Sequence, residues 1–309
     1  MDTRIVTSVL EPVRFEVLPF ARSVEEAARL PENVRLTVTC SPKHGPDRSI
    51  EVAGRLRELG HHVTVHVAAR MVSDRDHLDR ILAAMAQAGA DDLFLIGGDA
   101  DPPLGAYSSA VQLLDVVTDH PLRPRAIGIA GYPEGHPAIP AEALEEALAH
   151  KSRHADYVAT QMCFDPSALL TWTARQRAGG LTLPVLMGVP GKVSRTKLLE
   201  LSARIGVGPS LSFLRKQRGI RALLSKGSTA DRLYAKLAPA IDDPELNIAG
   251  FHIFTFNQLL ETWRWQRAHE DASSGPALEA GRRRRLAEPS ADRRHRPAPA
   301  PLTAKETDV

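Results

Sequence analysis

The chain has few cysteines and no long apolar run, and each absence excludes a class of protein. Only two cysteines, Cys40 and Cys163, occur among its 309 residues, and neither belongs to a metal-ligand spacing. Both lie in strand-like segments, so we expect buried, reduced thiols and a cytoplasmic protein, not a disulfide. No stretch approaches the roughly 20 apolar residues of a membrane span, and the first residues lack the apolar region of a signal peptide. We therefore expect a soluble protein with no membrane partner.

A strong excess of charge is also missing. Lys and Arg number 39 against 37 Asp and Glu, which gives a formal net charge of +2 at pH 7. Much of the basic excess lies in residues 282–285 and 293–296, within a stretch dominated by Pro, Ala, Arg, Ser and Glu without apolar periodicity. We expect residues 267–309 to form a disordered tail. Nucleic acid is not expected as a partner of the folded part.

The rest of the chain alternates short runs rich in Val, Ile and Leu with longer amphipathic stretches, the pattern of βαβ units. The strand-like runs are residues 14–18, 35–39, 63–67, 92–96, 126–130, 157–161, 184–188 and 250–256. Eight such units close a (β/α)8 TIM barrel. We predict an α/β fold in which residues 1–266 form one catalytic barrel domain. The longer gap between Gly188 and Gly250 predicts extra helices there.

Helical patterns fill the stretches between the strands. They cover residues 49–59, 76–88, 108–119, 141–150, 166–179 and 196–205, and a basic helical segment covers 212–226. Ser73 and Asp74 offer capping side chains before the second of these helices. Gly60 and Gly89 stand where helix ends favour left-handed backbone.

Polar side chains stand in or just after several of the predicted strands. Glu16 lies in the first, Asp99 follows the fourth, Tyr132 and His136 follow the fifth, and Gln161 ends the sixth. The carboxyl ends of parallel barrel strands converge on one face, so we expect these residues to line one pocket, as in an enzyme.

Glu16 faces the opposite way to its neighbours Phe15 and Val17. A buried carboxylate without a partner is costly and tends to keep its proton, which suits a general acid. The alternative is a salt bridge to Lys or Arg at the barrel rim. After the fourth strand, Gly97 and Gly98 would let backbone approach a flat ligand beside Asp99, or would form a plain strand-end turn.

Four histidines raise the question of a metal centre. His44, His66, His136 and His252 lie on different units, and none belongs to an H-E-x-x-H motif; the H-x-x-x-H spacing of His62 and His66 falls in a strand-like run and not on a helix. We therefore expect no metal.

The ordered set of motifs over roughly residues 14–260 resembles the methylenetetrahydrofolate reductase family. Its most specific part is Y-P-E-x-H-P from Tyr132 followed by T-Q-x-x-F-D from Thr160. The other segments are Phe15-Glu16, Asp47-Arg48-Ser49, His66, Gly98-Asp99, Pro190-Gly191 and residues 251–257.

The resemblance implies an oxidoreductase of one-carbon and methionine metabolism. Such an enzyme reduces 5,10-methylenetetrahydrofolate to 5-methyltetrahydrofolate with NAD(P)H, NADH being favoured here, usually through bound FAD, and a homo-oligomer fits the family. By resemblance, Glu16 is the general acid, Asp99 is catalytic and contacts both folate and flavin, and Gln161 binds the folate. The implied cofactor contacts, besides Asp99, are His66, Tyr132, His136 and Lys151.

Several positions depart from the family pattern. Gly97 replaces a common arginine before Gly98-Asp99, Phe254 replaces a common tyrosine, and Arg195-Thr196 stand where a stacking aromatic is frequent. These losses fall on flavin and nicotinamide contacts, so the sequence leaves FAD open: either the flavin is bound as usual, or a nicotinamide transfers hydride directly. Two other functions stay open, a folate-dependent methyl transfer or demethylation on the same barrel, and a non-catalytic binding barrel.

Overall fold

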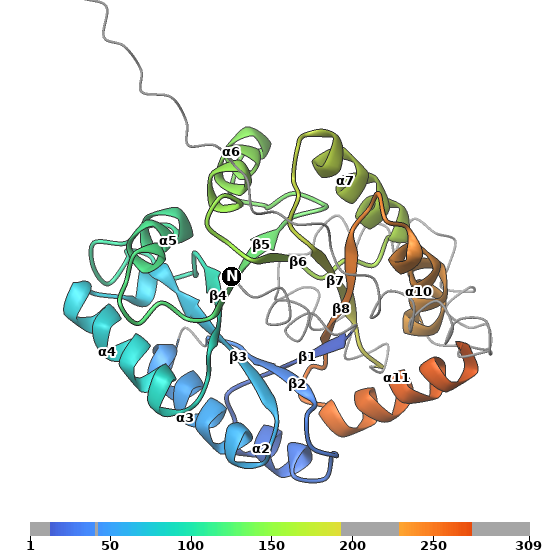
Figure 1. Ribbon diagram of the computed structural model, residues 1–309, viewed down its shortest axis with the longest axis horizontal. Coiled ribbons are helices and arrows are strands. Elements are labelled where there is room, and N and C mark those ends of the chain that lie inside the picture. Colours follow the sequence, from blue (N-terminus) through green and yellow to red (C-terminus); the bar gives the residue numbers. More distant parts are fainter. Residues whose placement is uncertain (1–12, 41–42, 193–228, 274–309) are drawn as a thin grey trace, which may run out of the picture. The chain divides into compact units, whose positions relative to one another are not determined.

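The computed structural model describes residues 13–40, 43–192 and 229–273, and its centre is a closed barrel of parallel strands (Figure 1). Each strand pairs with the next along the chain, and β8 closes the barrel against β1. The strands are β1 (Val13–Val17), β2 (Arg35–Val38), β3 (His62–Ala68), β4 (Asp92–Ile96), β5 (Ala126–Gly131), β6 (Tyr157–Thr160), β7 (Val185–Pro190) and β8 (Ile248–Phe254). The (β/α)8 prediction and all eight predicted strands are confirmed.

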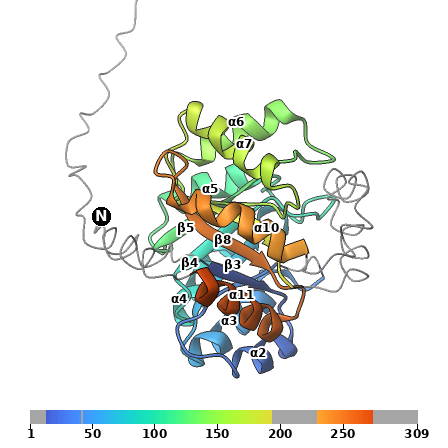
Figure 2. The same ribbon diagram turned by 90° about the vertical axis from the view of Figure 1, so that its right-hand side faces the viewer.

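Helices surround the barrel on the outside, as Figures 1 and 2 show. They are α2 (Ala21–Ala27), α3 (Gly45–Glu58), α4 (Arg75–Gln87), α5 (Ala110–Thr118), α6 (Ala141–Lys151), α7 (Pro166–Ala178), α10 (Thr229–Leu237) and α11 (Leu259–Ser273). Two short 3-10 helices, η1 (Ala69–Met71) and η2 (Ala238–Asp242), complete the set. Helices α3 to α7 were predicted, and α10 and η2 are extra helices in the gap before β8. The predicted helices at 196–205 and 212–226 lie outside the described residues.

The predicted helix boundaries have the expected local chemistry. Asp74 caps α4, because its Oδ1 accepts a hydrogen bond from the backbone N–H of His77 at 2.7 Å. Gly60 and Gly89 follow α3 and α4 with φ of +81° and +66°, a backbone conformation that a side chain disfavours.

The inside of the barrel holds a buried polar cluster near the start of its strands. The Arg14 guanidinium in β1 forms an ion pair with Asp92 of β4 at 2.7 Å, and the same nitrogen donates to the hydroxyls of Thr64 and Tyr157. Both hydroxyls donate in turn to the Asp92 carboxylate, at 2.8 and 3.0 Å. A Cβ at Gly128 would lie 2.2 Å from the Tyr157 ring, so glycine makes room for this network.

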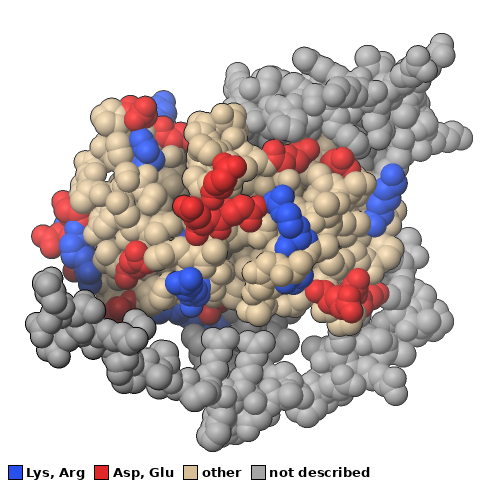
Figure 3. All heavy atoms as spheres, turned by 90° about the horizontal axis from the view of Figure 1, so that it is seen from above, with Lys and Arg blue, Asp and Glu red and all other residues tan. Residues whose placement is uncertain are grey.

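Cys40 and Cys163 form no disulfide with each other, as expected; Cys163 is buried, whereas Cys40 is only partly buried. Helix α11 extends to Ser273, past the expected start of the tail at residue 267, while residues 274–309 lie outside the described part. No helix among the described residues is both long and apolar enough to cross a membrane. Acidic and basic side chains are interspersed on the face shown in Figure 3.

Candidate active site

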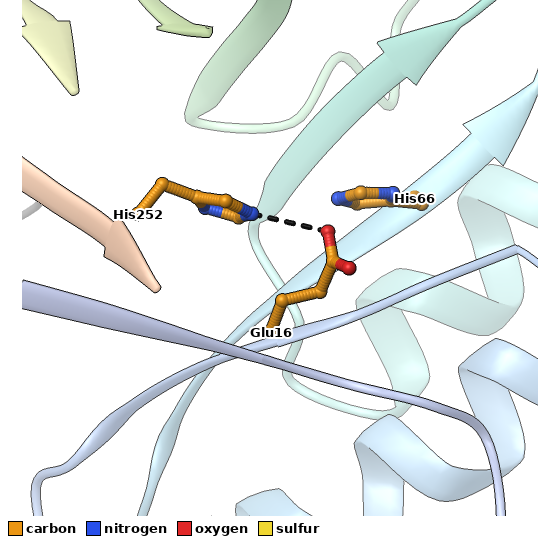
Figure 4. A group of neighbouring side chains, drawn as sticks. All are labelled: Glu16, His66 and His252. Carbon is orange, nitrogen blue, oxygen red and sulfur yellow. Dashed lines mark hydrogen bonds and ion pairs between the residues drawn. The ribbon is translucent and has the colours of Figure 1, made fainter. Parts of the chain in front are cut away.

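Three side chains from three strands meet inside the barrel (Figure 4). They are Glu16 of β1, His66 of β3 and His252 of β8, and one ligand-type atom from each lies within 4.8 Å of the others. Alternate strand residues share a face, so Glu16 and His66 each stand one inward position beyond Arg14 and Thr64 of the polar cluster. The group therefore forms a second polar layer, closer to the carboxyl ends of the strands.

Glu16 is paired with a histidine. Its Oε2 lies 3.1 Å from Nε2 of His252, and the two side chains are 15% and 4% exposed. The expectation of an unpartnered carboxyl group is thus wrong, and no Lys or Arg pairs with Glu16 among the described residues. One proton lies between the two groups, carried by either the carboxyl or the imidazole. The backbone of Glu16 is also held in place, because the Thr255 hydroxyl donates a hydrogen bond to the Glu16 carbonyl at 2.6 Å.

His66 is buried against aromatic rings. Its ring centroid lies 4.7 Å from that of Phe94 and 6.4 Å from that of His252. Burial, with a further effect of His252, lowers the pKa of His66 to about 3, so the ring is neutral at physiological pH. Nε2 of His66 is buried and has no hydrogen-bond partner among the described residues.

Asp99 follows β4 on an exposed turn that requires glycine. Gly98 has a φ of +86°, and a Cβ there would lie 2.7 Å from the Ala68 Cβ, whereas a Cβ at Gly97 would meet nothing within 4 Å. Arg70 holds this segment, because its backbone N–H donates to the Gly97 carbonyl at 2.9 Å. Open space beside the strand end fits the expected approach of a ligand.

Tyr132 and His136 lie together after β5. Their rings meet edge-on with centroids 5.5 Å apart. Burial and the negative charge of Asp99 raise the pKa of Tyr132, which places the β4 and β5 loops near each other. Gln161, directly after β6, has its side-chain oxygen occupied by the Met162 backbone N–H at 2.8 Å, so folate binding there would use its amide NH2 group.

Lys151 lies away from these strand ends. It is the last residue of α6, and the Ala155 backbone N–H donates to the Lys151 carbonyl. The next residue, Asp156, donates its backbone N–H to the carbonyl of Ile127, near the start of β5. The backbone of Lys151 is thus on the amino-terminal side of the sheet. Burial lowers the pKa of this lysine to about 8. The structure brings together Glu16 and His66, and separately Asp99 and Tyr132, but does not bring Lys151 to either pair.

Sequence reasoning gave His252 no site role, although it belongs to the eighth-strand motif of the resemblance. The signal that could have found it is its position on the inward face of β8. Where β8 closes against β1, Arg14 pairs with His252 and Glu16 pairs with Phe254. An apolar wall lies nearby, because His252 packs edge-on against Phe254 with centroids 5.0 Å apart. Phe254 and Phe256 pack against the buried pair Met162 and Phe164.

The matches to solved structures are distant. A putative phosphonomutase from Burkholderia cenocepacia is 16% identical with a TM-score of 0.42, covering 73% of this chain and 100% of that chain. An uncharacterized protein from B. cereus is 14% identical with a TM-score of 0.34, covering 57% and 46% of the two chains. Likeness at this level carries no functional argument.

Sequence comparisons are more specific. The family described as methylenetetrahydrofolate reductase matches residues 21–206, more than half of the chain. Methylenetetrahydrofolate reductase 2 of Saccharomyces cerevisiae is 26% identical over 123 residues, and methylenetetrahydrofolate reductase 1 of Schizosaccharomyces pombe is 27% identical over 122 residues. Each alignment covers 36% of this chain and 20% of the yeast protein. The matched region contains Asp99 and Gln161 but neither Glu16 nor His252. On the extent of the family match, the chain belongs to the methylenetetrahydrofolate reductase family.

Proposed function

We propose that this chain reduces 5,10-methylenetetrahydrofolate to 5-methyltetrahydrofolate, with NAD(P)H, preferably NADH, as the source of hydride. Family membership supports the reaction class. The observation that carries the proposal for this chain is the buried pair of Glu16 and His252, which keeps a transferable proton at the closure of the barrel. Reduction of this substrate needs such a proton when the folate ring opens.

Glu16 is the proton donor in this proposal. Protonation of a folate nitrogen opens the five-membered ring and leaves a cationic methylene iminium, to which hydride adds. His252 takes part by holding the Glu16 carboxyl group in one orientation and by exchanging the proton with it. Asp99 contributes negative charge beside the developing cation, and Gln161 offers hydrogen bonds to the pterin.

Flavin is the less well supported part of the family chemistry. FAD would supply a stacked hydride carrier, and its phosphates need cations or backbone N–H groups. Gly97 offers no charge where relatives carry arginine, and Arg70 is already engaged by the Ala100 carbonyl and Asp101. In the part of the chain that the structure describes, the turn after β4 therefore offers no free cation to a flavin phosphate, which favours direct transfer from the nicotinamide.

The first experiment is a visible absorption spectrum of the purified protein, followed by NADH oxidation with methylenetetrahydrofolate, with and without added FAD. A colourless protein that produces 5-methyltetrahydrofolate supports direct transfer, and bound FAD with FAD-dependent turnover contradicts it. Absence of turnover under every condition contradicts the proposed function. Binding of tetrahydrofolate without NADH oxidation would favour the methyl-transfer alternative.

A variant pair tests the role of Glu16. Glu16→Gln should lower turnover by on the order of 10²- to 10⁴-fold, because positioned acid catalysis is worth this much. Glu25→Gln, an exposed glutamate on α2, is the matched control and should keep full activity. Equal rates in both variants would show that Glu16 is not the acid.

A further inference from the structure

Glu16, His66 and His252 also have the composition of a metal site. Two imidazoles and one carboxylate are a ligand set found in zinc enzymes, where a further coordination position stays open. The three residues come from β1, β3 and β8, and their ligand atoms lie within 4.8 Å of one another.

The unpartnered nitrogen of His66 is the second observation that points to a ligand. His66 is 6% exposed, and its Nε2 has no hydrogen-bond partner among the described residues. Figure 4 shows the outer edge of this ring turned toward the Glu16 carboxylate. Leaving a buried polar nitrogen unpaired costs about 1–3 kcal/mol. In the tautomer protonated on Nδ1, the neutral imidazole presents a lone pair at Nε2, which a cation can accept.

The separations require little movement. Two ligand atoms at about 2.1 Å from a zinc ion, set at the tetrahedral angle, lie about 3.4 Å apart. Glu16 Oε2 and His252 Nε2 are 3.1 Å apart, and the widest of the three separations, at most 4.8 Å, would shorten by no more than about 1.4 Å. Small rotations about the side-chain bonds of the three residues would close a gap of this size.

We propose that Glu16, His66 and His252 bind a divalent transition-metal ion of the zinc class, and that the bound ion inhibits the enzyme. Metal binding displaces the proton between Glu16 Oε2 and His252 Nε2, because a carboxylate oxygen and an imidazole nitrogen with a free lone pair are the ligating forms. The metal then occupies the oxygen that carries the proton for ring opening. The binding site stands on geometry alone, whereas the inhibition rests on the proposed function.

Cobalt(II) is the probe for binding, because its visible bands report coordination by protein ligands. A second cluster, Asp115, His150 and His154, could bind cobalt at the surface. The double variant Asp115→Asn/His150→Gln therefore serves as the parent protein. We expect the parent to take up one cobalt per chain with visible bands.

His66→Gln in that parent should weaken cobalt binding by at least about 100-fold, since loss of a ligand exceeds the effect of losing a supporting residue. His252→Gln should do the same, so the result does not depend on the folding of one variant, and thermal melts verify that both are folded. Unchanged cobalt affinity in both folded variants, or a parent without visible bands, would overturn the site.

Zinc addition tests the inhibition separately. Turnover of the parent should fall as zinc binds and return when EDTA removes it. Full turnover with zinc bound would overturn the inhibition. A protein that binds cobalt at the three residues but never oxidises NADH would overturn the proposed function and leave the metal site intact.

Discussion

Lys151 is a buried amine whose charge costs stability, and Lys151→Met should remove that cost. The side chain is 6% exposed, and no hydrogen bond or ion pair to it is seen among the described residues. Burial lowers its pKa from 10.5 to about 8. Methionine has a similar length and no charge, so it fits the same space without the desolvation penalty.

The magnitude follows from proton linkage. A shift from 10.5 to about 8 corresponds to about 3 kcal/mol of lost stability at pH 7, where both the folded and unfolded states carry the charge. As pH rises through 8 the folded state loses its proton before the unfolded state does, so stability increases. Between pH 7 and pH 9 the gain is about 1 kcal/mol. For a chain of this size that equals about 2 °C in Tm.

Thermal unfolding of wild type and Lys151→Met at pH 7 and pH 9 measures this effect. The variant should be the more stable at pH 7, and the difference should shrink by about 2 °C at pH 9. Taking the Tm difference between the two proteins cancels the contribution of titrating groups that both contain, including tyrosines that titrate above this range. A difference that does not change with pH would refute the reasoning, because it would mean that Lys151 titrates alike in the folded and unfolded states.

Two further predictions concern buried groups. Asp92→Asn should destabilise the fold by about 3–5 kcal/mol, because it leaves Arg14 charged and buried without its carboxylate; Asp91→Asn, which removes an exposed pair with Arg125, should cost at most about 1 kcal/mol in the same urea titration. Similar losses in the two variants would contradict this account. Burial raises the pKa of Cys40 from 9.0 to about 11, so iodoacetamide at pH 8 should alkylate it about 100-fold more slowly in the folded than in the unfolded protein; equal rates would show an accessible thiolate.

The barrel was predictable because its signal is local and repeated. Each strand is a short apolar run followed by an amphipathic helix, so every unit gives the same pattern. The unpredicted helices lack that pattern. Helix α2 has seven residues and begins after Phe20 without a side-chain cap. In α11 the buried face includes Thr262 and Gln266, so its apolar periodicity is weak.

The site was harder to predict because its contacts join distant strands. Glu16 could be recognised as inward-facing from its neighbours alone, but its partner His252 is 236 positions away and becomes adjacent only when β8 closes on β1. The expectation of no metal rested on the absence of local histidine spacing. Barrel closure brings His66 and His252 together without any such spacing, while His44 and His136 stay on separate loops.

The two polar layers inside the barrel differ in how completely their hydrogen bonds are made. Arg14 and Thr64 stand one inward step below Glu16 and His66 on the same strands, with the same access to the barrel axis. The lower pair is bound into a network with Asp92, whereas the upper layer leaves the His66 nitrogen unpaired and rests on one shared proton. A buried network stabilises a barrel only when its hydrogen bonds are made. The upper layer, nearer the carboxyl ends where barrel enzymes act, is thus the one whose polar groups remain available to a substrate or an ion.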